Sequence, residues 1–366
     1  VLVSLFLFEH LSIPLPVPHI RVPQVYHTLA EEHPGDFTLL DLPVAWRNGF
    51  RVLGTQHPTI MFQQYYQTVH GKPILAGNTS RNPPLKFQYF AEAPVINTVI
   101  ALETGHQVEE SVLEQDRELA PEVLRFFNIQ AIFVHRHGYA EEQTGPAMLQ
   151  YVEQVLQARP VYDDGEIVGY QVALSPWPGV WQVEPGTALG RLSYAEGWGV
   201  PAGGAIWAQR PAVRLLVPLN GAAQQMVFRA YAPVGGQRLR LEANGQVVHE
   251  LEMDAGWNDY EFTLSAEAVQ AGLNDVWLHF DAQYPAGGVR LSPRTIGQTG
   301  VESPVNLVAE SAGQEVGDFG HIYVDGQDIS LNERGYNLAI LQPETGEVEA
   351  VASFDTHLDE GASQEL

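Results

Sequence analysis

The sequence predicts a multidomain α/β plus all-β protein, in which an α/β domain precedes an antiparallel, jelly-roll-like β-sandwich. Three observations support this fold class. The 366 residues exceed the length of one ordinary hydrophobic core. The first half mixes apolar strands with segments whose apolar residues recur at helical spacing. The second half consists of short alternating strands separated by turn signals.

The α/β domain is expected to span residues 20–178. Two apolar runs, FTLLDLPV (37–44) and AIFVHRH (131–137), predict buried strands. Three segments predict helices: QVYHTLAEE, SVLEQDRELAPEVLRFF and PAMLQYVEQVLQA. The domain closes with RPVYDDGEIVGYQVAL, which predicts two strands about an Asp-Gly turn.

The β-sandwich is expected to span residues 186–300, after a Pro-Gly boundary at 185–186. Its predicted strands are VRLLVPL, QMVFRAYA, QRLRLEANGQVVHELEM, NDYEFTLS and NDVWLHFDA. The Asn-Gly pair at 244–245 predicts a tight hairpin turn, and the spacing of the strands is typical of antiparallel sandwiches.

Residues 1–19 are interpreted as the end of a transmembrane helix and its linker. The run from Val1 to Phe8 carries no charge, but its eight residues would span only about 12 Å of helix, against the roughly 30 Å of a bilayer core. Prolines at 14, 16 and 18 fit a helix that ends at the membrane interface. The alternative is an apolar strand of a soluble fold.

Composition excludes several classes of function. The chain has 44 acidic and 19 basic residues, a net charge of −25, which repels phosphate backbones and excludes nucleic acid as a partner. The absence of cysteine excludes disulfides, thiolate catalysis and cysteine zinc sites. No nucleophile elbow, phosphate-binding loop or dinucleotide fingerprint is present in the sequence.

Sequence motifs add a resemblance that covers most of the chain. The motifs LDLPVAWRNGFRV, QQYYQTVHGKPILAGNTSRNP and APVINTVIAL resemble the extracytoplasmic domain that follows the last membrane helix of bacterial polytopic glycosyltransferase-like proteins. The segment LRLEANGQVVHELEMDAGWNDYEFTL is similar to galactose-binding-like jelly rolls. The tail GHIYVDGQDISLNERGYNLAILQPETGEVEAVASFDTHLDE resembles the interleukin-like EMT inducer domain.

This resemblance implies a location and a boundary. It places the chain at a bacterial cell membrane, on the extracytoplasmic side, attached through a missing N-terminal transmembrane region. Residues 301–366 would form a partial interleukin-like EMT inducer domain, because in that family the helix that begins at Leu358 continues. The chain is therefore expected to be a fragment clipped at both ends. No catalytic residue is implied, since the catalytic acid of such glycosyltransferases lies in an early loop.

A sugar site is predicted at Trp257, Asn258, Asp259 and Tyr260. Sugar sites pair an aromatic ring, which stacks on the apolar face of the sugar, with planar polar groups that bond its hydroxyls. Trp257 is placed in a turn. The alternative is that these aromatics pack the core, as the alternation predicts for Trp277 and as the shared strand face of Tyr260 and Phe262 suggests.

A second predicted site is an anion-recognition loop of His70, Lys72 and Arg81, which would face the phosphate of a lipid-linked sugar. The alternative is a loop that packs on the membrane portion. His135 and His137 would share a strand face and could bind a metal, but no third ligand stands at a diagnostic spacing. Neither a metal nor a cofactor is predicted.

Three functions remain. The favoured hypothesis is a non-catalytic accessory ectodomain that binds glycans or positions an acceptor. The first alternative is a structural cell-surface or filament component that assembles through its β-domains. The second alternative is a glycan-active enzyme, which the missing catalytic constellation places last.

Overall fold

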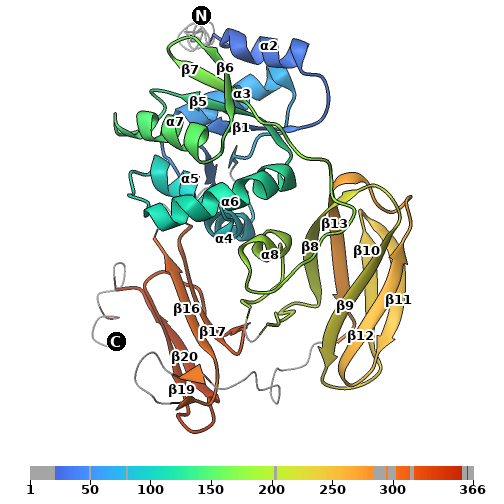
Figure 1. Cartoon of the computed structure of the whole chain (residues 1–366). Helices are drawn as coiled ribbons and strands as arrows, with labels where there is room; N and C mark the ends of the chain where they lie inside the picture. The colour runs from blue at the N-terminus through green and yellow to red at the C-terminus, as the bar shows by residue number, and fades with distance from the viewer. Residues whose placement is uncertain are drawn as a thin grey trace, which may run out of the picture.

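The computed structural model describes residues 21–48, 51–79, 81–201, 204–282, 294–295, 302–313, 317–356 and 361. The chain combines a mixed α/β unit, a β-sandwich and a C-terminal group of small antiparallel sheets (Figure 1). The α/β unit comprises α2 (Gln24–Glu32), β1 (Thr38–Leu42), β2 (Ala45–Arg47), β3 (Val52–Gly54), α3 (Thr59–His70), β4 (Gly77–Asn78), α4 (Pro84–Glu92), α5 (Ile96–Glu103), α6 (Glu110–Phe126), β5 (Ile129–His135), α7 (Thr144–Gln154), β6 (Arg159–Asp163) and β7 (Ile167–Gln171).

The main sheet of this unit has the order β1-β5-β7-β6. Strands β1 and β5 run parallel, whereas β7 is antiparallel to both of its neighbours. Both predicted buried strands are confirmed, and β6 and β7 form the predicted hairpin about Asp164-Gly165. Because β1 and β5 are parallel, their carboxyl ends lie at the same edge of the sheet.

The predicted helices correspond to α2, α6 and α7. Within the α/β unit, helices α3, α4 and α5 were not predicted. In α3 the buried positions are Ile60, Gln63, Tyr66 and His70. Two of these four are polar, so the apolar period that identifies a surface helix is interrupted.

The sandwich consists of β8 (Ala212–Asn220), β9 (Gln224–Ala232), β10 (Gln237–Ala243), β11 (Gln246–Met253), β12 (Gly256–Leu264) and β13 (Ala271–Phe280). One sheet has the order β11-β10-β13-β8 and the other pairs β12 with β9. Side chains from both sheets enclose one core, which includes Val213, Leu241, Phe262 and Leu278. All the predicted strands are confirmed, and Asn244 and Gly245 both take the positive φ that a tight hairpin needs.

A connecting segment with helix α8 (Ala188–Ser193) lies between the α/β unit and the sandwich (Figure 1). The C-terminal strands are β14 (Arg294–Thr295), β15 (Glu302–Ser303), β16 (Leu307–Ala312), β17 (Phe319–Val324), β18 (Gln327–Asp328), β19 (Tyr336–Leu341) and β20 (Val348–Phe354). They form the pair β14-β15, the sheet β16-β17-β18 and the hairpin β19-β20. The hairpin matches the two strands predicted in the tail, and Gly346 has the expected positive φ of 73°.

Two predictions fall on residues that the structure does not describe. The interpretation of residues 1–19 as the end of a membrane helix lies outside the described residues, and so does the helix expected from Leu358. Within the part of the chain that is described, none of the helices combines the length and the hydropathy required to cross a bilayer.

Candidate functional site

The outer face of strands β9 and β12 carries an aromatic pair, in which Trp257 is exposed and Tyr231 is half-buried. Trp257 on β12 lies directly opposite Tyr231 on β9, with ring centroids 5.5 Å apart and an interplanar angle of 59°. The indole of Trp257 is 45% exposed, which is unusual for a ring of this size in a β-sandwich. We call the surface formed by Trp257, Tyr231, Arg229 and Asp259 the aromatic face.

Two charged side chains complete the aromatic face. The guanidinium of Arg229 lies 5.9 Å from the ring centroid of Trp257, and its Nε is 3.9 Å from Asp259 Oδ1. Both charged side chains are largely exposed, at 68% and 74%, so their ion pair is weak and leaves donors and acceptors for a ligand. An aromatic platform flanked by planar polar groups is suited to a sugar ring.

The four residues of the predicted sugar site do not share one surface. Trp257 lies inside strand β12 and not in a turn, because the strand begins at Gly256. Successive side chains of a strand point to opposite sides, so Trp257 and Asp259 face outward while Asn258 and Tyr260 face inward. Asn258 donates to the carbonyl of Asp254, and Tyr260 stacks on Phe228.

The aromatic face therefore keeps Trp257 and Asp259 from the predicted site, and Tyr231 and Arg229 of β9 take the places predicted for Asn258 and Tyr260. Tyr231 and Arg229 lie within the predicted strand QMVFRAYA, but only the register between β9 and β12 brings them beside Trp257. Trp277 also differs from its prediction. It lies on the opposite side of β13 from the buried Val276 and Leu278, half-exposed and stacked on His279.

His70 and Lys72 are buried and have structural partners. The backbone N–H of Lys72 donates to His70 Nδ1 over 3.0 Å, and Lys72 Nζ donates to the carbonyl of Gly35 over 2.6 Å. The ammonium also lies 4.7 Å from the ring centroid of Phe37. Arg81, in contrast, is exposed. The structure brings His70 and Lys72 together and turns both toward the protein interior.

A second polar cluster lies at the carboxyl ends of β1 and β5. Tyr26 donates its hydroxyl to Asp41 Oδ2 over 2.7 Å, and His135 Nε2 lies 3.0 Å from Asp41 Oδ1 and 2.9 Å from the Tyr26 hydroxyl. Gln63 donates to the carbonyls of Asp41 and Pro43. The ring of His70 stacks on Tyr26. Because Asp41 is only 2% exposed, this cluster is a buried network that fixes the sheet edge.

Several side chains in or near this network have pKa values that differ from their ordinary values. Burial, followed by the charge of Asp41, raises the pKa of Tyr26 well above its ordinary value. Burial also lowers the pKa of His70 and raises that of Glu103, whose carboxylate accepts from the backbone N–H of Val44. Perturbed groups gather at functional sites, but also in structural networks. Since Tyr26 and Asp41 are buried and the His135 side chain is only 13% exposed, we assign this network a structural role.

Sequence reasoning did not pair Asp41 with His135. Each residue lies in the second half of a predicted strand, and a parallel pairing of those strands would have placed both side chains toward one edge. His135 and His137 do not share a strand face, because β5 ends at His135 and His137 lies in the following turn. Among the described residues, no group of three or more His, Cys, Asp or Glu side chains could hold a metal ion.

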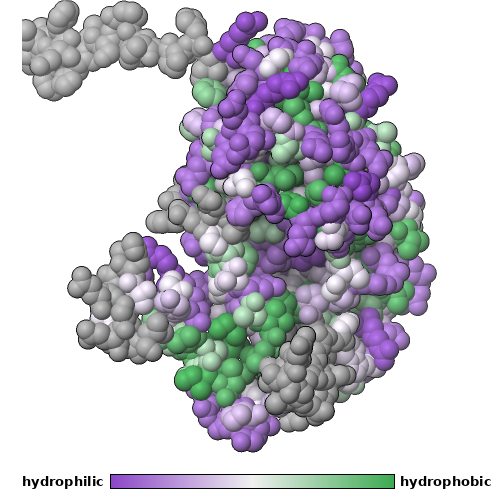
Figure 2. Space-filling view, turned by 60° about the vertical axis from the view of Figure 1, so that its left-hand side comes forward, coloured by the Kyte–Doolittle hydropathy of each residue, from purple (hydrophilic) through white to green (hydrophobic). Residues whose placement is uncertain are grey.

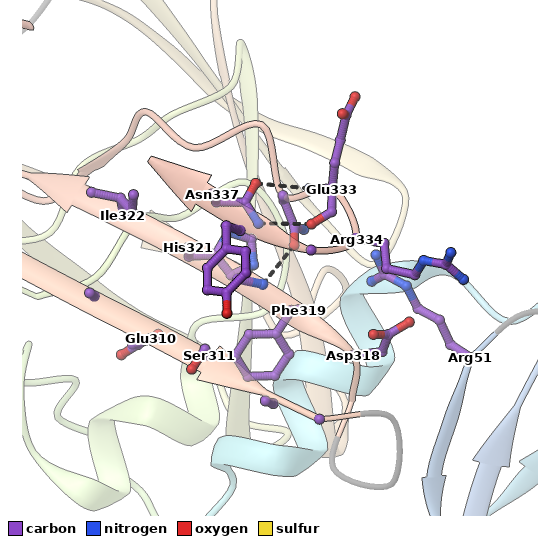
Figure 3. A pocket seen from close by; sticks show the side chains of 17 residues that line it. Arg51, Glu310, Ser311, Asp318, Phe319, His321, Ile322, Glu333, Arg334 and Asn337 are labelled. Atoms are coloured by element: carbon purple, nitrogen blue, oxygen red, sulfur yellow. Dashed lines mark hydrogen bonds between the residues drawn. The ribbon is translucent and has the colours of Figure 1, made fainter. Parts of the chain in front are cut away.

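An open hollow of about 520 Å³ lies between β16, β17 and the start of β19. Figure 3 shows Arg51 and Arg334 at one side of this hollow and Glu310 and Ser311 at the other. Arg334 is engaged by Asp355, with nitrogen–oxygen distances of 3.0 and 3.2 Å. Since the carboxyl groups of Asp318, Glu310 and Glu333 also line the hollow beside Arg51, the charge there does not favour an anion.

No protein-family model matches this chain, and no curated protein matches it significantly.

Proposed function

We propose that this chain is a non-catalytic accessory ectodomain of a membrane glycosyltransferase-like protein and that it binds a glycan, or the sugar of a lipid-linked donor, on the aromatic face. It would act on the extracytoplasmic side of a bacterial membrane. The observation that carries this proposal is the exposed ring of Trp257, which packs against the half-buried Tyr231 and is flanked by Arg229 and Asp259.

The proposal includes the family of each of the two β-rich parts. The two antiparallel sheets that enclose one core support a galactose-binding-like jelly roll. The sheet β16-β17-β18 and the hairpin β19-β20 support a partial interleukin-like EMT inducer domain. Non-catalytic sandwiches suit binding because their rigid strands hold an aromatic platform in place without a loop rearrangement.

The expected affinity follows from the size of the platform. A sugar that covers about 50 Å² of the Trp257 ring gains roughly 1.3 kcal/mol at about 25 cal/mol per Å², which is about tenfold in affinity. With a few hydrogen bonds from Arg229 and Asp259, a dissociation constant of about 1 mM is expected.

The test is calorimetric titration of the chain with a panel of neutral and acidic oligosaccharides. The Trp257→Ala variant should weaken binding about tenfold. The matched control is Val227→Ala, which alters the same outward face of β9 without removing a ring. Binding that survives in Trp257→Ala, or that falls equally in both variants, would exclude the aromatic face as the sugar site.

A second candidate function, assembly with further copies of the chain, is favoured by one observation. Tyr336, Leu338 and Ile340 alternate along β19 on one side of the strand, and they are 57%, 41% and 57% exposed. Figure 2 shows the extended hydrophobic area on this part of the surface. Apolar area of this kind marks interaction surfaces.

Sedimentation of the wild-type chain and of a Leu338→Ser, Ile340→Ser variant tests assembly. Assembly through β19 requires that the wild-type chain self-associates and that the variant remains monomeric. If both chains sediment as monomers at about 100 μM, which corresponds to a free energy of association weaker than about −5.5 kcal/mol, self-assembly is excluded under those conditions.

A further inference from the structure

Helix α4 and the sheet β16-β17-β18 meet through one row of polar side chains. Gln88 and Glu92 are four residues apart, so they lie on the same face of α4. Gln88 donates to the hydroxyl of Tyr323 on β17 over 3.2 Å. On the sheet, Val308 pairs with Tyr323 and Glu310 pairs with His321, two pairs further along, which places Glu310 on the same sheet face as Tyr323. Glu310 therefore approaches the end of α4 that carries Glu92.

Of the two carboxyl groups at this junction, Glu92 has a guanidinium partner in Arg191. Arg191 of α8 donates to Glu92 Oε2. The other oxygen of Glu92, Oε1, is buried and has no hydrogen-bond partner among the described residues. Glu310 Oε2 is likewise buried and has no hydrogen-bond partner among the described residues. Each unpaired buried acceptor costs free energy, and two facing carboxylates repel each other in a partly desolvated site.

Titratable groups face Glu310 from every element around it. They are Glu92 from α4, Arg191 from α8, His321 from β17 and Asp328 from β18. His321 is held by Asp328, with Nδ1 2.6 Å from Asp328 Oδ2. Burial, followed by the charge of Glu92, raises the pKa of Glu310, while His321 and Arg191 act in the opposite direction. The repulsive and desolvating contributions outweigh the attractive ones.

We propose that Glu310 and Glu92 form a proton-binding clamp, which strengthens the docking of the β16-β17-β18 sheet on α4 as the pH falls. One proton on this carboxyl pair cancels a charge of the repelling pair and supplies a donor to an oxygen that otherwise lacks one. The device is conformational: it couples the C-terminal sheet to the α/β unit according to proton concentration.

The direction of the pH effect follows from the linkage between proton binding and docking. A carboxyl whose pKa is higher in the docked state than in the separated state binds more protons when docked. Docking is therefore strongest below the ordinary glutamate pKa, and it weakens as the pH rises through the raised pKa of Glu310. One proton linked to docking changes the docking equilibrium by at most about tenfold per pH unit.

The experiment measures docking directly in the full chain. The chain has no cysteine, so Lys86→Cys on α4 and Ala309→Cys on β16, both exposed positions, allow two spin labels to be attached at defined places. Double electron–electron resonance then gives the distance distribution between α4 and β16 from about pH 4 to about pH 8.5, a range that begins below the ordinary glutamate pKa and extends well above it. A narrow distribution at low pH that broadens as the pH rises is expected.

Two variants separate the clamp from general acid effects. Glu310→Gln keeps the shape of the side chain and removes its titration, so its distance distribution should not change with pH. Glu344→Gln removes one negative charge from an exposed position of the same C-terminal unit and should respond as the wild type does. A pH-independent wild type, or a Glu310→Gln variant that still broadens, would overturn the proposal. Loss of docking at all pH values in Glu310→Gln would also overturn it.

Discussion

The buried network of Tyr26, Asp41 and His135 predicts a large effect for a small substitution. Tyr26→Phe removes one hydroxyl and keeps the ring, which packs against Tyr66 and Phe133. The hydroxyl donates to Asp41 over 2.7 Å. After the substitution, His135 remains the side chain that contacts this carboxylate in the described part of the chain.

The expected magnitude follows from the burial of Asp41. Loss of one hydrogen bond to a charged group costs about 1.5–3 kcal/mol, because the buried carboxylate has no water to replace the donor. The matched control is Tyr65→Phe on α3, since Tyr65 is 45% exposed and its hydroxyl can bond to water in either state. A surface change of that kind is expected to stay within about 0.5 kcal/mol.

The assay is native-state hydrogen exchange of peptides from β1 and β5, followed by mass spectrometry. This readout reports the opening free energy of the α/β unit alone and avoids the assumption that a chain with several units unfolds in one step. If Tyr26→Phe lowered that free energy no more than Tyr65→Phe does, the network would not hold the sheet edge.

Three further outcomes are expected. Burial, before any other cause, raises the pKa of Tyr26, Tyr139 and Tyr151 well above ordinary tyrosine values. The stability that these groups contribute is therefore present below about pH 10 and is lost as the pH rises through their folded pKa values. Tyrosinate absorbance should appear together with unfolding. Glu103→Gln should preserve the acceptor for Val44 and reduce the loss of stability that accompanies rising pH above about 4.5, as urea unfolding at several pH values would show. Gly326→Ala should destabilise the turn after β17 by more than about 1 kcal/mol, because its φ is +82° and a Cβ atom would lie 2.5 Å from Trp207 Cδ1; thermal unfolding measures this effect.

Local sequence patterns predicted most of the strands because each pattern lies within one strand. The alternation in QRLRLEANGQVVHELEM and its Asn-Gly turn define β10, β11 and their connection without reference to any other part of the chain. Helix α3 was not predicted from the hydrophobic pattern because its buried face carries the polar residues Gln63 and His70. These polar side chains are buried for their hydrogen bonds, which a hydrophobic pattern does not register.

The candidate sites could not be predicted in the same way, because each depends on contacts between distant segments. Trp257 was identified because planar polar residues follow it directly in the sequence. Tyr231 lies beside it only through the register of β9 with β12. A shift of one residue in that register would turn either ring toward the core. Asp41 and His135 meet in the same way, through the parallel pairing of β1 with β5. For this chain, sequence therefore predicts which residues can carry chemistry, and strand register decides which of them act together.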